Sequence, residues 1–457
     1  MILTEAHVIR KNRKTRELFR RIDGCCYQAK NLHNAVNYRI KQCSRICRKL
    51  AEEKPLEQWE QEFLDELNDA LHLYNAGRAE SKRLKILGSE NGNIADAYFL
   101  SWYLKGSSEY REMPYATCGQ ICIQTVCRNW KSFYRSMKAW KKNPGKFPGM
   151  PKAPGYLDKK TGREPLVLTK QNISVDDQGN IRLPRFLEGI YLKTEKKNIH
   201  QIRIVTEKDR IRIDVMYEQK EKNPVDASGI MGIDLGVNNL MAVSMNTDTP
   251  PVLINGRTLK SINQYYNKQK ALFQSESMKQ HGKYMTSRIR RLTGKRNRKV
   301  KDYMHKASRA VIHMALENGI GTIVIGKNDE WKQKLSVKKD TEWKNNVHKR
   351  KKTNQNFVSI PHNILIDMIK YKGALEGIRV IEIRESYSSG TSYLDEEQPV
   401  KKNYDKSRRI HRGLFRSNKG IFINADVNAA YQIMKRAGFG SNDSPKSREC
   451  VRRIKVA

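Results

Sequence analysis

Asp234 and Asp426 are candidate ligands for a metal ion. Asp234 ends the apolar run 230–233, a predicted buried strand, and a tight turn and a returning strand at 240–244 are predicted to follow it. Asp426 opens a predicted helix within residues 424–430. Carboxylates are the hard oxygen ligands that Mg²⁺ prefers. Taken singly, each residue also fits a local role, Asp234 as a turn residue and Asp426 as a helix N-cap.

Taken together, the segments Met231-Gly-Ile-Asp-Leu-Gly-Val-Asn-Asn-Leu-Met-Ala-Val-Ser244 and Asn424-Ala-Asp-Val-Asn-Ala-Ala430 resemble the RuvC nuclease of the TnpB family. These proteins are transposon-encoded, RNA-guided DNA endonucleases related to type V CRISPR effectors. The resemblance covers nearly the whole chain; it is strongest from residue 226 onward and from 128 to 217, and weakest across 44–115. It implies a ribonuclease-H-like domain in which Asp234 and Asp426 are catalytic metal ligands.

The third ligand of the family is a glutamate, and this chain departs from the usual pattern. Most members carry that glutamate at the end of the strand after a long helix, where this chain has Gly326. Some carry it at the end of the next strand, before a Ser-Tyr-Thr-Ser-like run. Similarity to that variant, through Arg384-Glu-Ser-Tyr-Ser-Ser389, implies Glu385, and strand ends on one sheet edge converge. Glu382 is a weaker candidate, predicted to face solvent. The alternative interpretation of Gly326 is an inactive nuclease.

The resemblance implies two Mg²⁺ or Mn²⁺ ions as cofactors, and no zinc is expected. None of the eight cysteines forms a C-x-x-C pair, and the interval of about 388–420, where the family carries zinc-finger cysteines, contains none. His411 is a single possible ligand there. Seven cysteines precede residue 128 and are predicted to be buried, reduced thiols.

The formal net charge of +40 predicts a polyanionic partner. A membrane-surface role is the competitor, weakened because no long apolar run and no signal peptide is apparent. Residues 283–301 hold nine Lys or Arg and no acid, and are predicted to follow the backbone of a guide–target heteroduplex. The aromatic residues near 130 are predicted to pack in a core. The candidate nucleic-acid contacts are Arg288, Arg290, Arg291, Lys295, Arg296, Arg298, Lys299, Arg135, Lys138, Arg408, Arg409 and Arg412. For the last three, a solvated basic loop is the alternative.

The predicted fold class combines an α/β domain, a β-barrel and a helical lobe. Residues 1–20 are expected to supply a first strand and a basic arm, 21–127 a helical recognition domain, 128–225 a proline-rich connector and a wedge β-barrel, and 226–457 the RuvC-like nuclease domain with its cysteine-free finger loop. The names of these parts follow from the resemblance.

The resemblance implies an RNA-guided, metal-dependent DNA endonuclease of a mobile element, whose target is chosen by guide pairing and a short flanking DNA motif. Its partners would be guide RNA and double-stranded DNA, with no membrane, in a cytoplasmic, nucleoid-associated prokaryotic protein. A cleavage-dead, RNA-guided DNA-binding repressor is the alternative. A DNA-joining transposase is disfavoured, because family members that resemble this chain cut DNA without joining it. The oligomeric state stays open.

Overall fold

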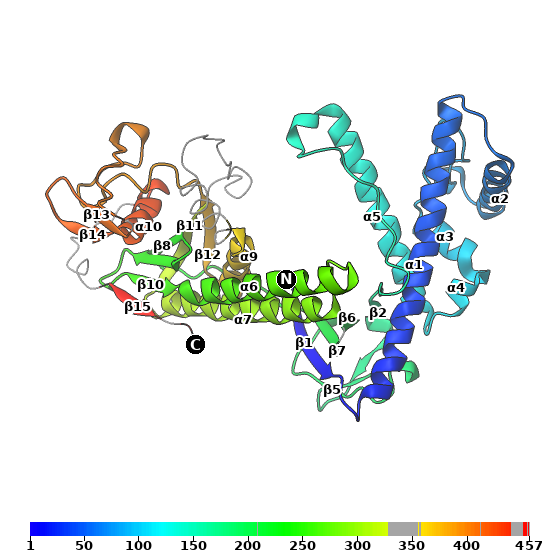
Figure 1. Cartoon of the computed structure of the whole chain (residues 1–457), viewed down its shortest axis with the longest axis horizontal. Coiled ribbons are helices and arrows are strands. Elements are labelled where there is room, and N and C mark those ends of the chain that lie inside the picture. The colour runs from blue at the N-terminus through cyan, green and yellow to red at the C-terminus, as the bar shows by residue number, and fades with distance from the viewer. Residues whose placement is uncertain are drawn as a thin grey trace. The chain divides into compact units, whose positions relative to one another are not determined.

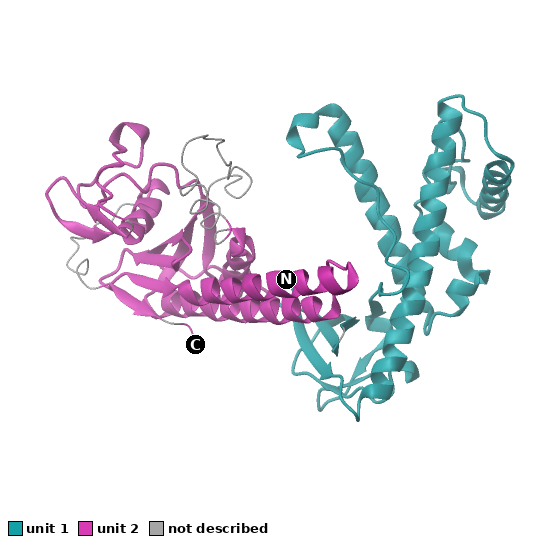
Figure 2. Cartoon of the chain, viewed as in Figure 1, with its two compact units in different colours: residues 1–219 teal, residues 220–457 magenta. Residues whose placement is uncertain are grey.

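The computed structural model describes residues 1–207, 209–327, 355, 358–411, 413–439, 451–454 and 456. The chain divides into two compact units, Met1–Gln219 and Lys220–Ala457 (Figure 2). This division falls a few residues before the predicted start of the nuclease domain. Within the part described, no helix is both long enough and apolar enough to cross a bilayer.

A four-stranded antiparallel sheet in the order β1-β7-β6-β2 anchors the first unit, and β3, β4 and β5 form a smaller sheet. Side chains of β7 alternate between buried and partly exposed, as expected for a strand with one face on a core. The predicted antiparallel pairing is confirmed, whereas closure of both sheets into one barrel stays a prediction. The strands are β1 (Ile2–Arg10), β2 (Leu166–Thr169), β3 (Ser174–Val175), β4 (Asn180–Arg182), β5 (Leu192–Lys193), β6 (Ile199–Glu207) and β7 (Arg210–Glu218).

The α-helices of the first unit all lie between β1 and β2 in the chain. Leu32, Val36 and Ile40 follow the predicted four-residue spacing and are fully buried on the longest of them. Trp130 is buried and donates from Nε1 to Asn37 Oδ1 at 2.7 Å, which confirms its place in the core. The helices are α1 (Arg16–Ala51), α2 (Gln58–Asn75), α3 (Ala97–Tyr103), α4 (Ser108–Arg111) and α5 (Ala116–Lys142).

The second unit contains a six-stranded sheet in the order β12-β11-β8-β9-β10-β15 (Figure 1). β8, β11 and β12 run parallel, so their carboxyl ends meet at one edge, whereas β9 returns antiparallel to β8. The strands are β8 (Gly229–Leu235), β9 (Asn239–Met245), β10 (Val252–Asn255), β11 (Ile320–Gly326), β12 (Arg379–Ile383), β13 (Leu414–Arg416), β14 (Phe422–Asn424) and β15 (Arg452–Ile454).

Helices cover both faces of this sheet. One apolar core joins β8 and β11 to α7 and α9, and another joins the opposite face to α10. The basic region after residue 257 is a helix pair, with α6 and α7 side by side (Figure 1). The helices are α6 (Arg257–His281), α7 (Ser287–Glu317), α9 (His362–Leu375) and α10 (Ala425–Arg436).

Candidate active site

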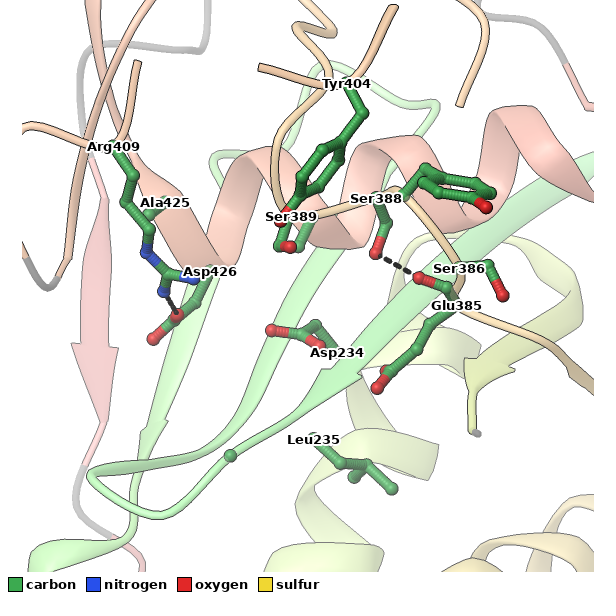
Figure 3. Close-up of a pocket in the computed structure, with 13 residues that line it drawn as sticks. Asp234, Leu235, Glu385, Ser386, Ser388, Ser389, Tyr404, Arg409, Ala425 and Asp426 are labelled. Carbon is green, nitrogen blue, oxygen red and sulfur yellow. Dashed lines mark hydrogen bonds and ion pairs between the residues drawn. The ribbon is translucent and has the colours of Figure 1, made fainter. Parts of the chain in front are cut away.

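Three carboxylates from distant parts of the sequence line one cavity of about 660 Å³ in the second unit (Figure 3). Asp234 is the penultimate residue of β8, Glu385 follows the end of β12 by two residues, and Asp426 is the second residue of α10. In Figure 3 Asp234 lies between the other two. The structure thus brings together the three residues that the sequence analysis singled out.

Local sequence explains how α10 comes so close to β8. A Cβ on Gly232 would collide with the carbonyl oxygen of Ala430 in α10, so only glycine fits at this position of the strand. Asn424 caps the helix by accepting from the amides of Asp426 and Val427 at 3.0 and 3.2 Å. The Asp426 carboxylate is therefore not the cap and remains available to the cavity.

Two side chains hold the Asp426 carboxylate. Asn239 donates to Oδ2 at 2.8 Å, and Arg409 donates to Oδ1 at 3.3 Å. Asn239 begins β9, and Arg409 comes from the loop that follows β12, so the turn after Asp234 and the finger loop both orient Asp426.

The cavity favours the protonated forms of Asp234 and Glu385. Burial, together with the charges of Glu385 and Asp426, raises the pKa of Asp234 well above its usual range, against a smaller opposing effect of Arg409. Burial raises the pKa of Glu385 to about 7. Like charges that converge in a poorly solvated site are stabilised by a cation, so this electrostatic arrangement fits bound divalent metal.

Gly326 and Glu385 occupy the same region at the sheet edge. A Cβ on Gly326 would lie 3.1 Å from Glu385 Oε2 and 3.0 Å from Ile433 Cγ1, with Ile433 Cδ1 closer still. The carboxylate of Glu385 therefore fills space beside the strand end where most of the family carries its glutamate. That Glu385 serves as the relocated ligand stays a prediction.

The three carboxylates are not among the groups of described residues whose ligand atoms all lie within 4.8 Å of one another.

Glu382 does not line the cavity. Its carboxylate pairs with Lys327 at 2.7 Å and with Lys370. These lysines lower its pKa against the raising effect of burial. Glu382 is thus partly buried in an ion-pair network, whereas the sequence analysis expected it to face solvent.

The finger loop is organised without cysteine. Glu397 accepts from Arg408 Nη1 at 2.7 Å and from the amide of Ser392 at 2.8 Å. Asn428 of α10 exchanges hydrogen bonds with the backbone at Thr391 and Tyr393. Ion pairs and amide hydrogen bonds thus fasten the described part of this loop to α10.

The candidate nucleic-acid contacts differ in their exposure and in their protein partners. Most are exposed: Arg135, Lys138, Arg288, Arg290, Arg291, Lys295, Arg298 and Lys299. Arg296 is instead tied to Asn263 at 2.7 Å and to the Ser359 carbonyl at 2.6 Å, so it joins α6, α7 and the segment before α9. Arg408 and Arg409 are engaged as described above, and Arg412 lies outside the described residues. The prediction for Arg296 overlooked these neutral partners, because only nearby acids were considered.

Sequence reasoning did not single out Asn239 or Tyr404 as parts of the site. Tyr404, Ser388 and Ser389 line the cavity with the acids, and Ser388 donates to the Glu385 carbonyl at 2.8 Å (Figure 3). The Ser-Tyr-Ser-Ser run after Glu385 was the available signal for the serines. Nothing in the local sequence marks Tyr404.

Comparison with known proteins gives two family matches. The OrfB_IS605 model, described as "Probable transposase", matches residues 210–332, and the model of the Cas12f1-like TNB domain matches residues 362–433. The second match spans the finger loop although the loop lacks cysteine. No curated protein matches the sequence.

Solved structures show a loose likeness in fold. A Cas12f1–sgRNA–target DNA complex has a TM-score of 0.48 at 13% identity, covering 94% of this chain and 98% of the other. A CRISPR–Cas12f ternary complex has a TM-score of 0.35 at 15% identity, covering 88% of this chain and 80% of the other. Scores in this range say nothing about activity. The two family matches, in contrast, lie in both halves of the α/β unit and support the expected likeness to the TnpB family.

Proposed function

We propose that this protein is an RNA-guided DNA endonuclease that hydrolyses phosphodiester bonds with two Mg²⁺ or Mn²⁺ ions. Asp234, Glu385 and Asp426 are the ligands in this proposal. The observation that carries it is their convergence in one cavity at the carboxyl edge of the sheet. The matches to the OrfB_IS605 and Cas12f1-like TNB models support the same reaction class.

Asp234, Glu385 and Asp426 would hold two divalent ions, which would supply stabilisation of the charge that develops on the oxygens during phosphodiester hydrolysis. Asp234 lies between Glu385 and Asp426 in Figure 3, so all three side chains could take part in holding the ions. Asn239 orients Asp426 through the hydrogen bond at 2.8 Å. Arg409 donates to Asp426 Oδ1 at 3.3 Å, so an ion bound by Asp426 would share this carboxylate with the guanidinium.

The exposed face of α7 is the proposed path of the guide–target duplex. Arg291, Lys295 and Arg298 are spaced by four and three residues, so they lie on one helical face, and all three are exposed. The opposite face carries Val300 and Met304 into the core. A row of cations on a rigid helix contacts phosphates regardless of base sequence.

The first unit has the remaining roles in this proposal. Its helices, inserted between β1 and β2, correspond to the recognition domain, and its antiparallel sheets correspond to the wedge barrel. Guide RNA would specify the target by base pairing, and the protein would read a short flanking motif. Double-stranded DNA and its unwound strands are the substrate.

A cleavage-dead repressor is the rival function, and the Gly326 substitution is the observation that favours it. Sequencing RNA that co-purifies with the protein tests the shared part of both functions, since a defined scaffold with a variable end is expected. Incubation of that complex with matched plasmid and Mg²⁺ separates them. Tight guided binding without cleavage in the wild type would favour the repressor, and random cellular RNA would contradict both.

A further inference from the structure

A second group of metal-ligating side chains lies in the first unit. His33 comes from α1, Cys122 from α5, and Glu164 from the segment before β2, and one ligand atom of each lies within 4.8 Å of the other two. His33 and Cys122 are 7% and 3% exposed. Within the described part of the chain, no other group of three His, Cys, Asp or Glu side chains meets this distance criterion. We propose that these residues bind one transition-metal ion, best matched by zinc, with water as the fourth ligand.

The contact between the imidazole and the carboxylate supports convergence on a cation. His33 Nδ1 lies 3.2 Å from Glu164 Oε2, yet this buried nitrogen has no partner in hydrogen-bond geometry. A protonated Nδ1 at this distance would ordinarily point at the carboxylate. Because this contact lacks hydrogen-bond geometry, the buried nitrogen has no partner among the described residues and could coordinate a cation together with Glu164.

The separations need only a small contraction. Zinc bonds of about 2.0–2.1 Å to nitrogen and oxygen and about 2.3 Å to sulfur place tetrahedral ligands roughly 3.4–3.6 Å apart. The ligand atoms already lie within 4.8 Å of one another. Small side-chain rotations that shorten these distances by about 1 Å would bring them to the separations that zinc requires.

The backbone that carries Glu164 is held against α1. The Glu164 amide donates to the Cys26 carbonyl at 3.1 Å, and neighbouring Arg163 forms an ion pair with Asp23 at 2.7 Å. Asn34 exchanges two hydrogen bonds of 2.9 Å with the backbone of Leu157. The ligands therefore sit on elements whose positions are set by other contacts, as a preorganised site requires.

The types of the three ligands favour zinc, and a neighbouring cavity gives the ion a route to the site. A thiol, an imidazole and a carboxylate together suit zinc, whereas Mg²⁺ prefers oxygen ligands alone. His33 also lines a cavity of about 470 Å³ with Ser132 and Pro154, which offers a route for the ion and for a water ligand. A bound ion would cross-link α1, α5 and the segment before β2.

This inference is independent of the proposed function, because the site lies in the first unit and takes no part in the reaction. It departs from the expectation of a zinc-free protein. That expectation rested on spacing along the chain, and the three ligands lie at positions 33, 122 and 164. Spacing cannot reveal a site whose members meet only after folding.

Metal analysis of the full-length protein tests the site. After dialysis against metal-free buffer, about one zinc per chain is expected, in a background of Asp234→Ala and Asp426→Ala that removes competing ligands. Cys122→Ser and Glu164→Gln should each lower the zinc content to well under half. Cys118→Ser is the matched control, because that thiol lies on the same helix, is buried, and donates to the Val167 carbonyl at 3.4 Å.

Cobalt substitution keeps the test informative if a variant folds poorly. Co²⁺ in the otherwise unaltered chain should give a thiolate-to-metal absorption band, present in Cys118→Ser and absent in Cys122→Ser. A metal-stripped protein that takes up no zinc and whose melting temperature is unmoved by added zinc would overturn the inference. Equal loss of zinc in the Cys118 and Cys122 variants would also overturn it.

Discussion

Replacing Glu385 with glutamine should separate activity from stability. The amide keeps the size of the side chain but removes the charge that a metal ligand needs. A loss of about 4 kcal/mol of transition-state stabilisation, or roughly a thousandfold in cleavage rate, is expected. The stability of the protein without metal should instead increase in this variant. Burial raises the pKa of Glu385 from its ordinary value of 4.5 to about 7, so the ionised group destabilises the metal-free fold.

The size of the stability gain follows from that shift. At pH values above 7 the glutamine variant should be more stable than the wild type without metal by up to about 3 kcal/mol, because each pKa unit is worth about 1.36 kcal/mol. Urea unfolding in chelator at pH 8 measures this difference. Cleavage of matched plasmid by the purified guide complex, at saturating Mg²⁺, measures the rate.

Glu382→Gln is the matched control, three residues earlier and carrying the same substitution. Glu382 pairs with Lys327 and Lys370 outside the cavity, so its loss should change the cleavage rate by less than about tenfold and the stability by about 1 kcal/mol or less. A rate for Glu385→Gln within about tenfold of the wild type would refute the assignment of Glu385.

A rescue variant tests whether a carboxylate at position 326, at the end of β11, can bind the same ions as Glu385. Gly326→Glu restores the family's usual position, but its Cβ would collide with Ile433 Cδ1. Ile433→Val removes that atom at a cost of about 0.5–1.5 kcal/mol. In the Glu385→Gln background, Gly326→Glu with Ile433→Val should recover part of the lost rate, whereas Ile433→Val alone should recover none. No recovery in a variant that folds and binds its target would count against a shared site.

Three further outcomes are expected. Asp234→Ala or Asp426→Ala should abolish cleavage and leave guided binding nearly intact, and residual cleavage above a few per cent of wild-type rate would contradict the site. Changing Arg291, Lys295 and Arg298 to glutamine should weaken the salt dependence of DNA binding for every guide alike. The slope of the logarithm of the binding constant against the logarithm of salt concentration should fall by about 0.9 per lost phosphate contact. An unchanged slope would place the duplex elsewhere. In metal-free protein, stability should fall as pH rises from 4.5 to about 7, because the folded state binds the Glu385 proton more tightly than the unfolded chain, and unfolding of Glu385→Gln should show a weaker dependence.

The sequence alone determined the parts whose signals are local. Asp234 ends an apolar strand and Asp426 starts a helix, and both features follow from residues within a few positions. The same holds for β11, β12 and the long basic helices. Glu385 could be chosen because the chain after β12 resembles a variant of the family, and because parallel strands end at one edge. Periodicity and short motifs suffice for such inferences, since they depend on neighbours in the chain.

Tertiary structure alone decided which groups satisfy one another. Whether a cation is free for phosphate depends on packing, so Arg296, bound to Asn263, could not be distinguished by sequence from its exposed neighbours on α7. Asn424, rather than Asp426, caps α10 because of the dihedral angles at the helix start. The meeting of His33, Cys122 and Glu164 likewise requires α1, α5 and the segment before β2 to pack together. The free energy of such contacts depends on distance and burial in the folded chain, quantities that spacing along the sequence does not contain.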